Sequence, residues 1–443
     1  MKIIFEPEVV LQGDKFIKNK GVLVENGVIA EISDAERLIE KHKDATIAKW
    51  DNLAMVPGTI NSHNHSFQSL LRGIATDKPF LTWRDEALYK YSPKLSKEDI
   101  YVGALFAFAE MLKYGVTTVC DFFYVHNDGL ESDEAVIKAA KDLGIRLVLA
   151  RCMYDWEGAP KGYQESVEEA VNNVRTLAEK YKNDPMVTIS PAPHSLHAAS
   201  IEMVKAGHQL AKELNTNYHI HVAEEMFEVE ETLKNHGLRP VELLREIGVL
   251  DESTVMIHAV WLTEEEIKLL GENKVKLAYC PSSNMFLADG ITKIPEMLKG
   301  GVSIGLGTDG GCSNNRISVF EEMRMAALLQ KVGNLDSTII NSNQVFSMGT
   351  EQGGKVLGLP IGKIEVGYMA DFVGINLKDL SMQPIYSIEE SLLPNLVYSM
   401  QPNAISKVVV AGKEIVNENK LLSMVEEEIL TKIQSLIEKL KWC

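Results

Sequence analysis

The sequence lacks any long uninterrupted apolar run. None of its hydrophobic stretches reaches the roughly 18 residues that a membrane-spanning helix needs. The apolar run within residues 1–6 is also too short, and the segment is too acidic, for a secretory signal peptide. We therefore expect no membrane span and a protein of the cytoplasm.

Cysteine is scarce and scattered. The chain of 443 residues has five cysteines, and no two lie close enough in sequence for a metal knuckle or a disulfide framework. They are Cys120, Cys152, Cys280, Cys312 and Cys443. Reduced thiols fit this pattern best, which again favours the cytoplasm.

Clusters of basic residues are absent as well. The formal net charge is −17, and no stripe of Lys and Arg interrupts the acidic excess. Binding to nucleic-acid phosphates or to an anionic membrane surface needs such clusters. We therefore expect neither nucleic acid nor membrane as a partner. Hydrophobic residues make up 45% of the chain, which is ample for a large core and more than one structural unit.

A glycine-rich phosphate loop after the first strand is also missing, and this bears on the fold class. In the middle of the chain, short apolar runs alternate with amphipathic segments such as 201–214 and 240–247. Eight such units are typical of a (β/α)8 barrel, whereas the rival, a doubly wound open sheet, would need the missing loop. We therefore expect an α/β fold with a barrel at 57–361. Its strands should end near His65, Phe122, Ala150, His194, His221, His258, Cys280 and Asp309.

The two ends of the chain have a different, β-rich character. Residues 21–32 place two β-prone runs around Asn26-Gly27, which is the strongest short hairpin signal. Strand and turn patterns return at 366–375 and 405–416. We expect residues 1–56 and 362–443 to form one small composite β-sandwich domain, with a helix at the C-terminal end.

The most informative feature present is a pair of histidines, His63 and His65, at the end of an apolar run. A β-strand points residues i and i+2 to the same face, so this pair presents two imidazoles side by side. That is half of a tetrahedral metal site, although a pair of surface histidines is the ordinary alternative. Three later apolar runs also end in polar residues. The first ends in His219, His221 and Glu224, the second ends in His258, and the third ends in Asp309.

Three imidazoles and one carboxylate can hold a single Zn²⁺ or Fe²⁺ and leave room for water. Such a metal lowers the pKa of that water toward about 7. We assign His63, His65, His221 and Asp309 as the ligands, with zinc preferred over iron. His219 is the alternative to His221 because both point to one strand face. His221 lies closer to the C-terminal end of the strand, where barrel sites are found.

Glu224 and His258 are then left as acid and base. Attack of hydroxide on a C=N carbon needs a proton delivered to the nitrogen, and the leaving amine needs another. A partly desolvated carboxyl beside a metal site can carry such protons. The neighbouring Glu225 is more typical of a solvated surface charge.

Six motifs carry a family resemblance: Val56-Pro57-Gly58 before His63-Asn64-His65, His221-Val222-Ala223-Glu224, His258-Ala259, Cys280-Pro281-Ser282-Ser283-Asn284, Gly307-Thr308-Asp309-Gly310 and Gly367-Tyr368-Met369-Ala370-Asp371. Together they resemble the amidohydrolase superfamily, in the branch of cytosine deaminase-like, adenosylhomocysteine deaminase-like and triazine hydrolase-like enzymes. The resemblance implies a barrel, a β-sandwich from both termini and a mononuclear metal site. It also implies that His258 and Asp309 activate water while Glu224 hands a proton to the substrate nitrogen. The bridging lysine of the binuclear branches has no counterpart in 187–194.

The first half of the chain also resembles formimino-glutamate deiminase. The similar segments are 65–68, 82–85, 122–126 and 192–196. In that enzyme the Gln, Arg and Tyr of these motifs touch the substrate, which implies Gln68, Arg84 and Tyr124 here. His197 stands where the deiminase has an arginine, and residues 310–315 look like the ring deaminases, so the pocket is a hybrid. We expect His194 and His197 to complete the substrate-binding residues together with Arg151.

Arg84 and Arg151 are expected on loops at the top of the barrel. Arg151 directly follows the apolar run 145–150, so it lies at the C-terminal end of a strand. The functional interpretation is that an arginine holds a carboxylate or an electron-rich ring edge of the substrate. The alternative is a structural ion pair with a loop carboxylate such as Asp155 or Asp85.

The leading hypothesis is a metal-dependent hydrolytic deaminase that removes ammonia from an amidine-type carbon of a small molecule, such as a purine-like or pterin-like ring or a formimino compound. One alternative is a formimino-amino-acid deiminase specifically. Another is a triazine-type hydrolase, although Glu224 argues against chloride as leaving group because chloride needs no proton. A non-catalytic scaffold would normally have lost ligands, and all are present here.

Self-association is a further expectation. Residues 424–442 predict a helix in which Ile429, Ile433, Leu436 and Leu440 share one face. Such a face more often packs on its own subunit than on a partner. This helix face, together with the self-association of similar enzymes, nevertheless leads us to expect a homo-oligomer, dimeric or higher.

Overall fold

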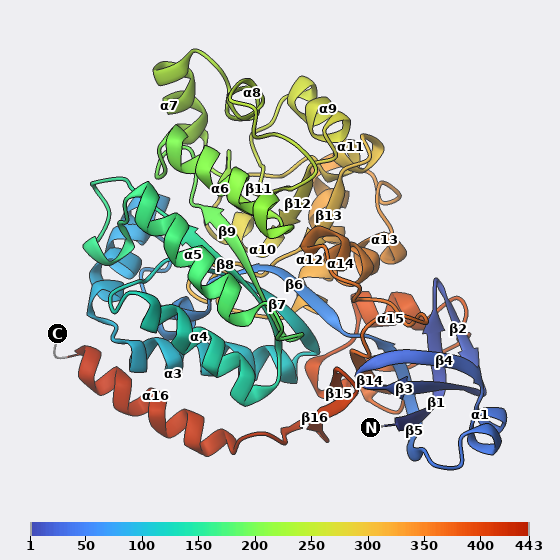
Figure 1. Ribbon diagram of the computed structural model, residues 1–443. Coiled ribbons are helices and arrows are strands. Elements are labelled where there is room, and N and C mark those ends of the chain that lie inside the picture. The colour runs from blue at the N-terminus through green and yellow to red at the C-terminus, as the bar shows by residue number, and fades with distance from the viewer. Residues whose placement is uncertain (1, 442–443) are drawn as a thin grey trace.

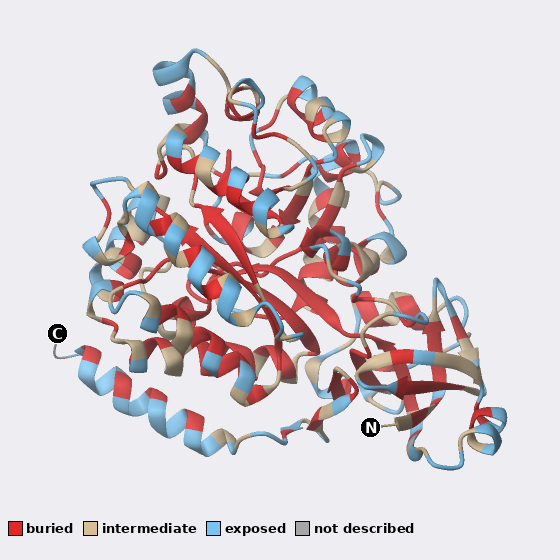
Figure 2. Ribbon diagram, viewed as in Figure 1, coloured by how far each residue is buried: buried red, intermediate tan, exposed pale blue. Residues whose placement is uncertain are grey.

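The computed structural model describes residues 2–441 and has an α/β architecture (Figure 1). Eight parallel strands lie at its centre: β6 (Thr59–Asn64), β7 (Val116–Phe123), β8 (Arg146–Met153), β9 (Val187–Pro193), β10 (Tyr218–Val222), β11 (Thr254–His258), β12 (Lys276–Tyr279) and β13 (Ser303–Leu306). They end within three residues of the predicted positions, and the largest differences are at β8, which continues beyond Ala150 to Met153, and at β13, which stops at Leu306 before Asp309. All eight strands are largely buried, as Figure 2 shows, which explains why they read as continuous apolar runs.

The eight strands hydrogen-bond in two runs of four, β6-β7-β8-β9 and β10-β11-β12-β13. Two backbone bonds connect these runs. The amide of His221 donates to the carbonyl of His194 at 2.9 Å, which links β10 to the end of β9. On the other side the amide of Asp309 donates to the carbonyl of His63 at 3.0 Å. The strands therefore surround one common interior, and the predicted (β/α)8 fold is confirmed.

Helices alternate with these strands and cover the outside. They include α3 (Lys97–Lys113), α4 (Leu130–Leu143), α5 (Val167–Tyr181), α6 (Ile201–Leu214), α7 (Met226–His236), α8 (Pro240–Glu246), α9 (Glu264–Glu272), α10 (Pro281–Phe286), α11 (Ile294–Lys299), α12 (Val319–Asn334), α13 (Ser342–Met348), α14 (Glu351–Leu357) and α15 (Leu392–Tyr398). Helix α5 shows how the sequence specifies them. Ser166 and Glu169 form a capping box at its start, and Ala170, Val174 and Leu177 form its buried face.

Strands from both ends of the chain pair in one nine-stranded sheet of order β17-β16-β15-β14-β5-β1-β3-β4, with β2 on β1. Its members are β1 (Lys2–Gln12), β2 (Lys15–Lys18), β3 (Lys20–Glu25), β4 (Val28–Asp34), β5 (Thr46–Pro57), β14 (Phe372–Asn376), β15 (Ile405–Val410), β16 (Lys413–Asn417) and β17 (Lys420–Leu421), and α1 (Ala35–Lys41) follows β4. The two ends meet where β5 pairs antiparallel with β14. Phe5 packs edge-on against Trp50 and Phe372, with ring centroids 5.5 and 5.6 Å apart. We propose two domains, one composed of residues 1–56 together with 362–443 and the other of residues 57–361.

The hairpin predicted around Asn26-Gly27 joins β3 to β4. Both turn residues have positive φ, 52° and 82°. A two-residue turn that matches the twist of its strands requires such angles, and Asn-Gly adopts them at low cost. The local turn signal therefore specified this register correctly.

The C-terminal helix α16 (Glu426–Lys441) lies along the outside of the barrel next to α3 (Figure 1). The four apolar residues of its predicted face are all buried, and the Lys113 ammonium pairs with the Glu426 carboxylate at 2.7 Å. This face is therefore used within the chain. The last predicted residue of the helix, Trp442, lies outside the described residues. Across 2–441, no helix is both long and apolar enough to cross a membrane.

Candidate metal and catalytic site

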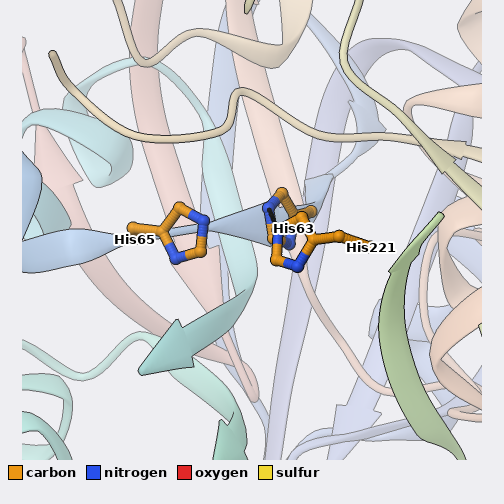
Figure 3. A group of neighbouring side chains, drawn as sticks. All are labelled: His63, His65 and His221. Carbon is orange, nitrogen blue, oxygen red and sulfur yellow. Dashed lines mark hydrogen bonds between the residues drawn. The ribbon is translucent and has the colours of Figure 1, made fainter. Parts of the chain in front are cut away.

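Four side chains converge at the C-terminal ends of the barrel strands. His63 belongs to β6, His65 follows it directly, His221 belongs to β10, and Asp309 follows β13. Each is at most 5% exposed. Figure 3 shows the three imidazoles gathered in one place, with the His63 and His221 rings next to each other and His65 across from them. Strand periodicity brings these residues together from three distant parts of the sequence.

The distances within this group fit one metal ion. A tetrahedral ion with nitrogen and oxygen ligands at about 2.0–2.1 Å places neighbouring ligand atoms roughly 3.3 Å apart. The His63 Nε2 atom lies 3.3 Å from His221 Nε2 and 3.4 Å from Asp309 Oδ1. The His65 Nε2 atom lies 3.3 Å from the same Asp309 oxygen. These spacings are those expected of ligand atoms around one ion.

The surroundings prepare the imidazoles to act as ligands. Burial lowers the pKa of His63 to about 3 and the pKa of His221 well below its usual value, so both rings stay neutral. His65 Nδ1 lies 2.6 Å from the carbonyl of Phe122, and His221 Nδ1 lies 3.0 Å from that of His194. Each Nδ1–H donates to its carbonyl, which leaves the Nε2 lone pair directed at the shared centre.

The Asp309 carboxylate is fixed by two hydroxyl groups. Ser283 Oγ donates to Asp309 Oδ2 at 2.5 Å, and Ser313 Oγ donates to the same oxygen at 2.9 Å. The other oxygen, Oδ1, faces the histidines. Ser283 belongs to α10, which follows β12, and Ser313 belongs to the turn after β13. The position of the strand ends in the sequence indicated a role for neither serine.

Glu224 and His258 lie against one another beside this group. The Glu224 Oε1 atom is 3.4 Å from His258 Nε2, and His258 Nδ1 donates to Asn284 Oδ1 at 2.9 Å. Burial raises the pKa of Glu224 well above its usual value, and the charges of Asp289 and Asp309 add to this. A protonated Glu224 is a proton donor. Asn284, which orients His258, was quoted within a motif, but spacing alone gave it no role.

His219, the alternative ligand, lies elsewhere. It is fully buried, its Nδ1 is 3.8 Å from Cys120 Sγ, and burial lowers its pKa to about 3. It precedes His221 by one pleat of β10, which places it deeper in the barrel, away from the C-terminal end. The geometry therefore favours His221.

Three of the expected substrate-binding residues lie directly next to the metal-binding group. Gln68 Nε2 donates to Tyr124 Oη at 2.8 Å, and the Tyr124 ring lies 5.0 Å from the His65 ring. His194 stacks on His221 with ring centroids 4.9 Å apart. These residues form one wall of the site.

Arg84 and His197 lie further out. The Arg84 guanidinium donates to Asp85 at 2.9 Å and lies over the rings of Tyr89 and Trp156, 4.6 and 5.9 Å from their centroids. The His197 ring lies 5.9 Å from that of His194. Burial lowers the pKa of His197 to about 4, and the nearby charge of Arg84 contributes. The outer wall is thus aromatic with one cation.

Arg151 has a different environment, and the expectation that it lies on a loop was wrong, because β8 continues past it to Met153. Its side chain is fully buried. The guanidinium donates to both Glu165 carboxylate oxygens at 2.7 and 2.8 Å and to the Asp133 carboxylate at 3.2 Å. This geometry favours a structural ion pair over a substrate contact. The partners are Glu165 and Asp133, and not Asp155 or Asp85 as considered from the sequence. Asp155 instead accepts from the amide and hydroxyl of Ser200 at the start of α6.

A (β/α)8 barrel with three imidazoles and a carboxylate at its strand ends defines the class of metal-dependent hydrolases. The model of the Amidohydrolase family matches residues 54–415. The chain belongs to the amidohydrolase family, and this family uses a divalent metal.

Similar proteins narrow the activity. A 5-methylthioadenosine/S-adenosylhomocysteine deaminase of Thermodesulfovibrio yellowstonii is 34% identical over 424 residues, which cover 95% of this chain and 93% of the relative. A 5'-deoxyadenosine deaminase of Methanobrevibacter smithii is 35% identical over 444 residues, with 99% and 98% covered. The structure of an adenosine deaminase from Xanthomonas campestris with bound zinc superposes with a TM-score of 0.91 at 26% identity, over 100% and 99% of the two chains. The predicted reaction class, hydrolytic deamination at a C–N bond, is confirmed.

Proposed function

We propose that this protein is a zinc-dependent deaminase that removes the exocyclic amine from the adenine ring of an adenosine-type nucleoside altered at its 5' position. The relatives named above support this substrate class, since they are deaminases of 5'-modified adenosine compounds. The observation that carries the proposal is the buried pair of Glu224 and His258 beside the ligand set, 3.4 Å apart.

His63, His65, His221 and Asp309 would hold one metal per chain, with zinc preferred. When bound, the metal supplies a hydrolytic water whose pKa is lowered to about 7.

The protein's own residues move the protons. Glu224 donates a proton to the ring nitrogen next to the reacting carbon, and His258 with Asp309 accepts a proton from the attacking water. A second proton, delivered to the amine, lets ammonia leave as the C–N bond breaks, and the ring carbon keeps the oxygen. Buried Glu224, which is favoured in its protonated form, makes the first delivery. The second proton is the one that His258 with Asp309 took from the water, and the remaining proton of the added hydroxyl restores Glu224 as the carbonyl forms.

The substrate rests on the aromatic wall. Gln68, Tyr124 and His194 would contact the ring, and Arg84 and His197 would contact its substituent. Arg151 would support this wall from behind without touching the substrate. We also propose that the protein works in the cytoplasm and forms homo-oligomers.

A formimino-amino-acid deiminase is the second candidate, favoured by the Gln68–Tyr124 hydrogen bond next to the site and by Arg84 at its edge. One experiment separates the candidates. Protein purified without chelator is analysed for metals and assayed for ammonia release from 5'-deoxyadenosine, 5'-methylthioadenosine, S-adenosylhomocysteine, formiminoglutamate, a pterin and an aminotriazine.

The proposal expects about one zinc per chain and the highest kcat/KM on an adenosine compound. Preference for formiminoglutamate would support the second candidate. Activity on none of the adenosine compounds, with metal bound, would contradict the proposed substrate class.

A further inference from the structure

An apolar patch lies exposed on the outside of the barrel over α10 and α12. Its members, called here the α10–α12 patch, are Met285, Phe286, Ile291, Leu328, Val332 and Leu335. Their exposed fractions run from 38% for Phe286 to 92% for Leu335. A soluble monomer rarely leaves so many large apolar side chains uncovered in one place.

The members of this patch are contiguous. Met285, Leu328, Val332 and Leu335 line a single shallow groove of about 550 Å³. Ile291 joins them, because a Cβ added at Gly333 would lie 3.1 Å from Ile291 Cδ1. The helices α10 and α12 that carry the patch pack on each other.

Charged groups at the patch are already engaged within the chain. The Lys331 ammonium donates to Tyr398 Oη at 3.1 Å and lies over the Tyr398 ring. The Asp336 carboxylate accepts from the amide and the hydroxyl of Thr338, both at 2.7 Å. The groove is thus lined by one charge of each sign and has no net charge of its own, although the protein carries a net charge of −17.

Leu335 supplies an independent observation. It ends α12 in the left-handed conformation, with φ 51°. The helices α4, α7 and α14 end in this conformation with a glycine, and α6 ends with an asparagine. Glycine and asparagine are the residues that adopt this conformation most readily. A leucine is unfavourable there, and nothing in the described chain compensates, because its side chain is 92% exposed.

We propose that the α10–α12 patch is the surface by which a second copy of this chain binds, with Leu335 of each copy entering the groove of the other. A twofold interface brings the same protruding leucine and the same groove together twice, so one surface is complementary to itself. The patch exposes on the order of 600 Å² per copy, and two copies would cover roughly 1,200 Å², the lower limit of a stable interface.

The charge distribution favours a second copy over a membrane. Two chains of charge −17 repel each other over most of their surfaces, and a patch without net charge is where they can approach. An anionic membrane would repel the same acidic excess. The C-terminal helix does not compete for this role, because its apolar face is buried on α3.

The test compares two leucines of equal exposure. Leu335→Glu changes the patch, and Leu380→Glu changes a leucine that is 90% exposed and lies outside it. Sedimentation velocity at micromolar concentration should show wild type and Leu380→Glu as dimers or larger assemblies. Leu335→Glu should dissociate at least tenfold more readily, because a carboxylate would be buried in an apolar groove. Val332→Glu serves as a second patch variant, and circular dichroism verifies that every variant is folded.

A wild type that is monomeric at micromolar concentration would overturn the proposal, as would an oligomer that survives both patch changes. Sedimentation with vesicles of phosphatidylcholine tests the membrane alternative. Binding of a monomeric wild type to these vesicles, lost in Leu335→Glu, would assign the patch to a membrane instead.

Discussion

The two sides of the pocket are built from different parts of the fold. On the metal side, His63, His221 and Asp309 come from the ends of strands and are buried, and hydrogen bonds to His194 and Ser283 hold His221 and Asp309. On the outer side, Arg84 begins a short helical turn and Trp156 lies in the segment after β8, and the Arg84 guanidinium lies over the Trp156 ring. Strands fix the chemistry, which the whole family shares, whereas loops form the surface that distinguishes one substrate from another.

The two arginines of the outer side sharpen this difference. Arg151 is fully buried between Asp133 and Glu165, whereas the side chain of Arg84 is 23% exposed. One arginine therefore supports the wall and the other is available at its surface. The following changes test that division, from the largest expected effect to the smallest.

Arg151→Met should reduce the free energy of unfolding by about 3–5 kcal/mol, because two buried carboxylates lose their cation. Urea unfolding measures this. Arg175→Met is the control, since Arg175 pairs with Glu213 at the surface and should change stability by less than about 1 kcal/mol. An Arg151 variant of wild-type stability with a raised KM would instead place Arg151 among the substrate contacts.

Glu224→Gln should lower kcat for ammonia release by a factor of about 10² or more, because the proton donor is lost while the shape is kept. The matched control is Glu225→Gln, one residue further along the chain and outside the ligand set. Equal losses in both variants, or none in Glu224→Gln, would contradict the role of Glu224.

Arg84→Met should weaken substrate binding by about 2 kcal/mol, seen as a KM raised roughly 30-fold, because a charged hydrogen bond is lost. Lys90→Met, which removes a neighbouring charge that lies over Tyr91, controls for the local potential. If kcat/KM on the best substrate is unchanged and only the melting temperature drops, Arg84 belongs with Arg151 as a structural residue.

The smallest expected effect is on how much stability the protein loses in acid. Burial alone would raise the pKa of Asp133 and Glu165, but Arg151 reverses this and holds both pKa values below their usual range. The resulting stabilisation is present above the unfolded pKa values of about 4 and is lost as pH falls through the lower folded values. Between neutral pH and about pH 3, wild type should therefore lose about 1 kcal/mol more than Arg151→Met. An equal or smaller loss in wild type would contradict the ionised network.

The sequence was most informative where periodic structure places residues. His63, His65, His221 and Asp309 could be predicted because each ends an apolar run, and the strand ends of a barrel meet at one face. The choice of His221 over His219 followed from the same rule, and the geometry agrees with it. The C-terminal helix face was likewise readable from its spacing, although it packs on α3.

Residues that act through tertiary contacts were not predictable in this way. Asn284 orients His258 from α10, which follows β12, and Trp156 meets Arg84 only because the segment after β8 packs against the helical turn of residues 84–89. Arg151 was found at a strand end, but its partners Asp133 and Glu165 lie on other elements, and no local pattern connects them. The packing of separate elements on one another decides these contacts, and sequence spacing does not encode it.

Two histidines on one face of β10 offer the most direct test of the metal site. His221→Ala and His219→Ala remove identical side chains two residues apart, and each purified variant is analysed for bound metal by mass spectrometry beside its ammonia release. The structure predicts about one divalent ion per chain and near-normal deamination for His219→Ala, and loss of both for His221→Ala. Retention of metal by His221→Ala, with its loss from His219→Ala, would contradict the ligand set on which the account rests.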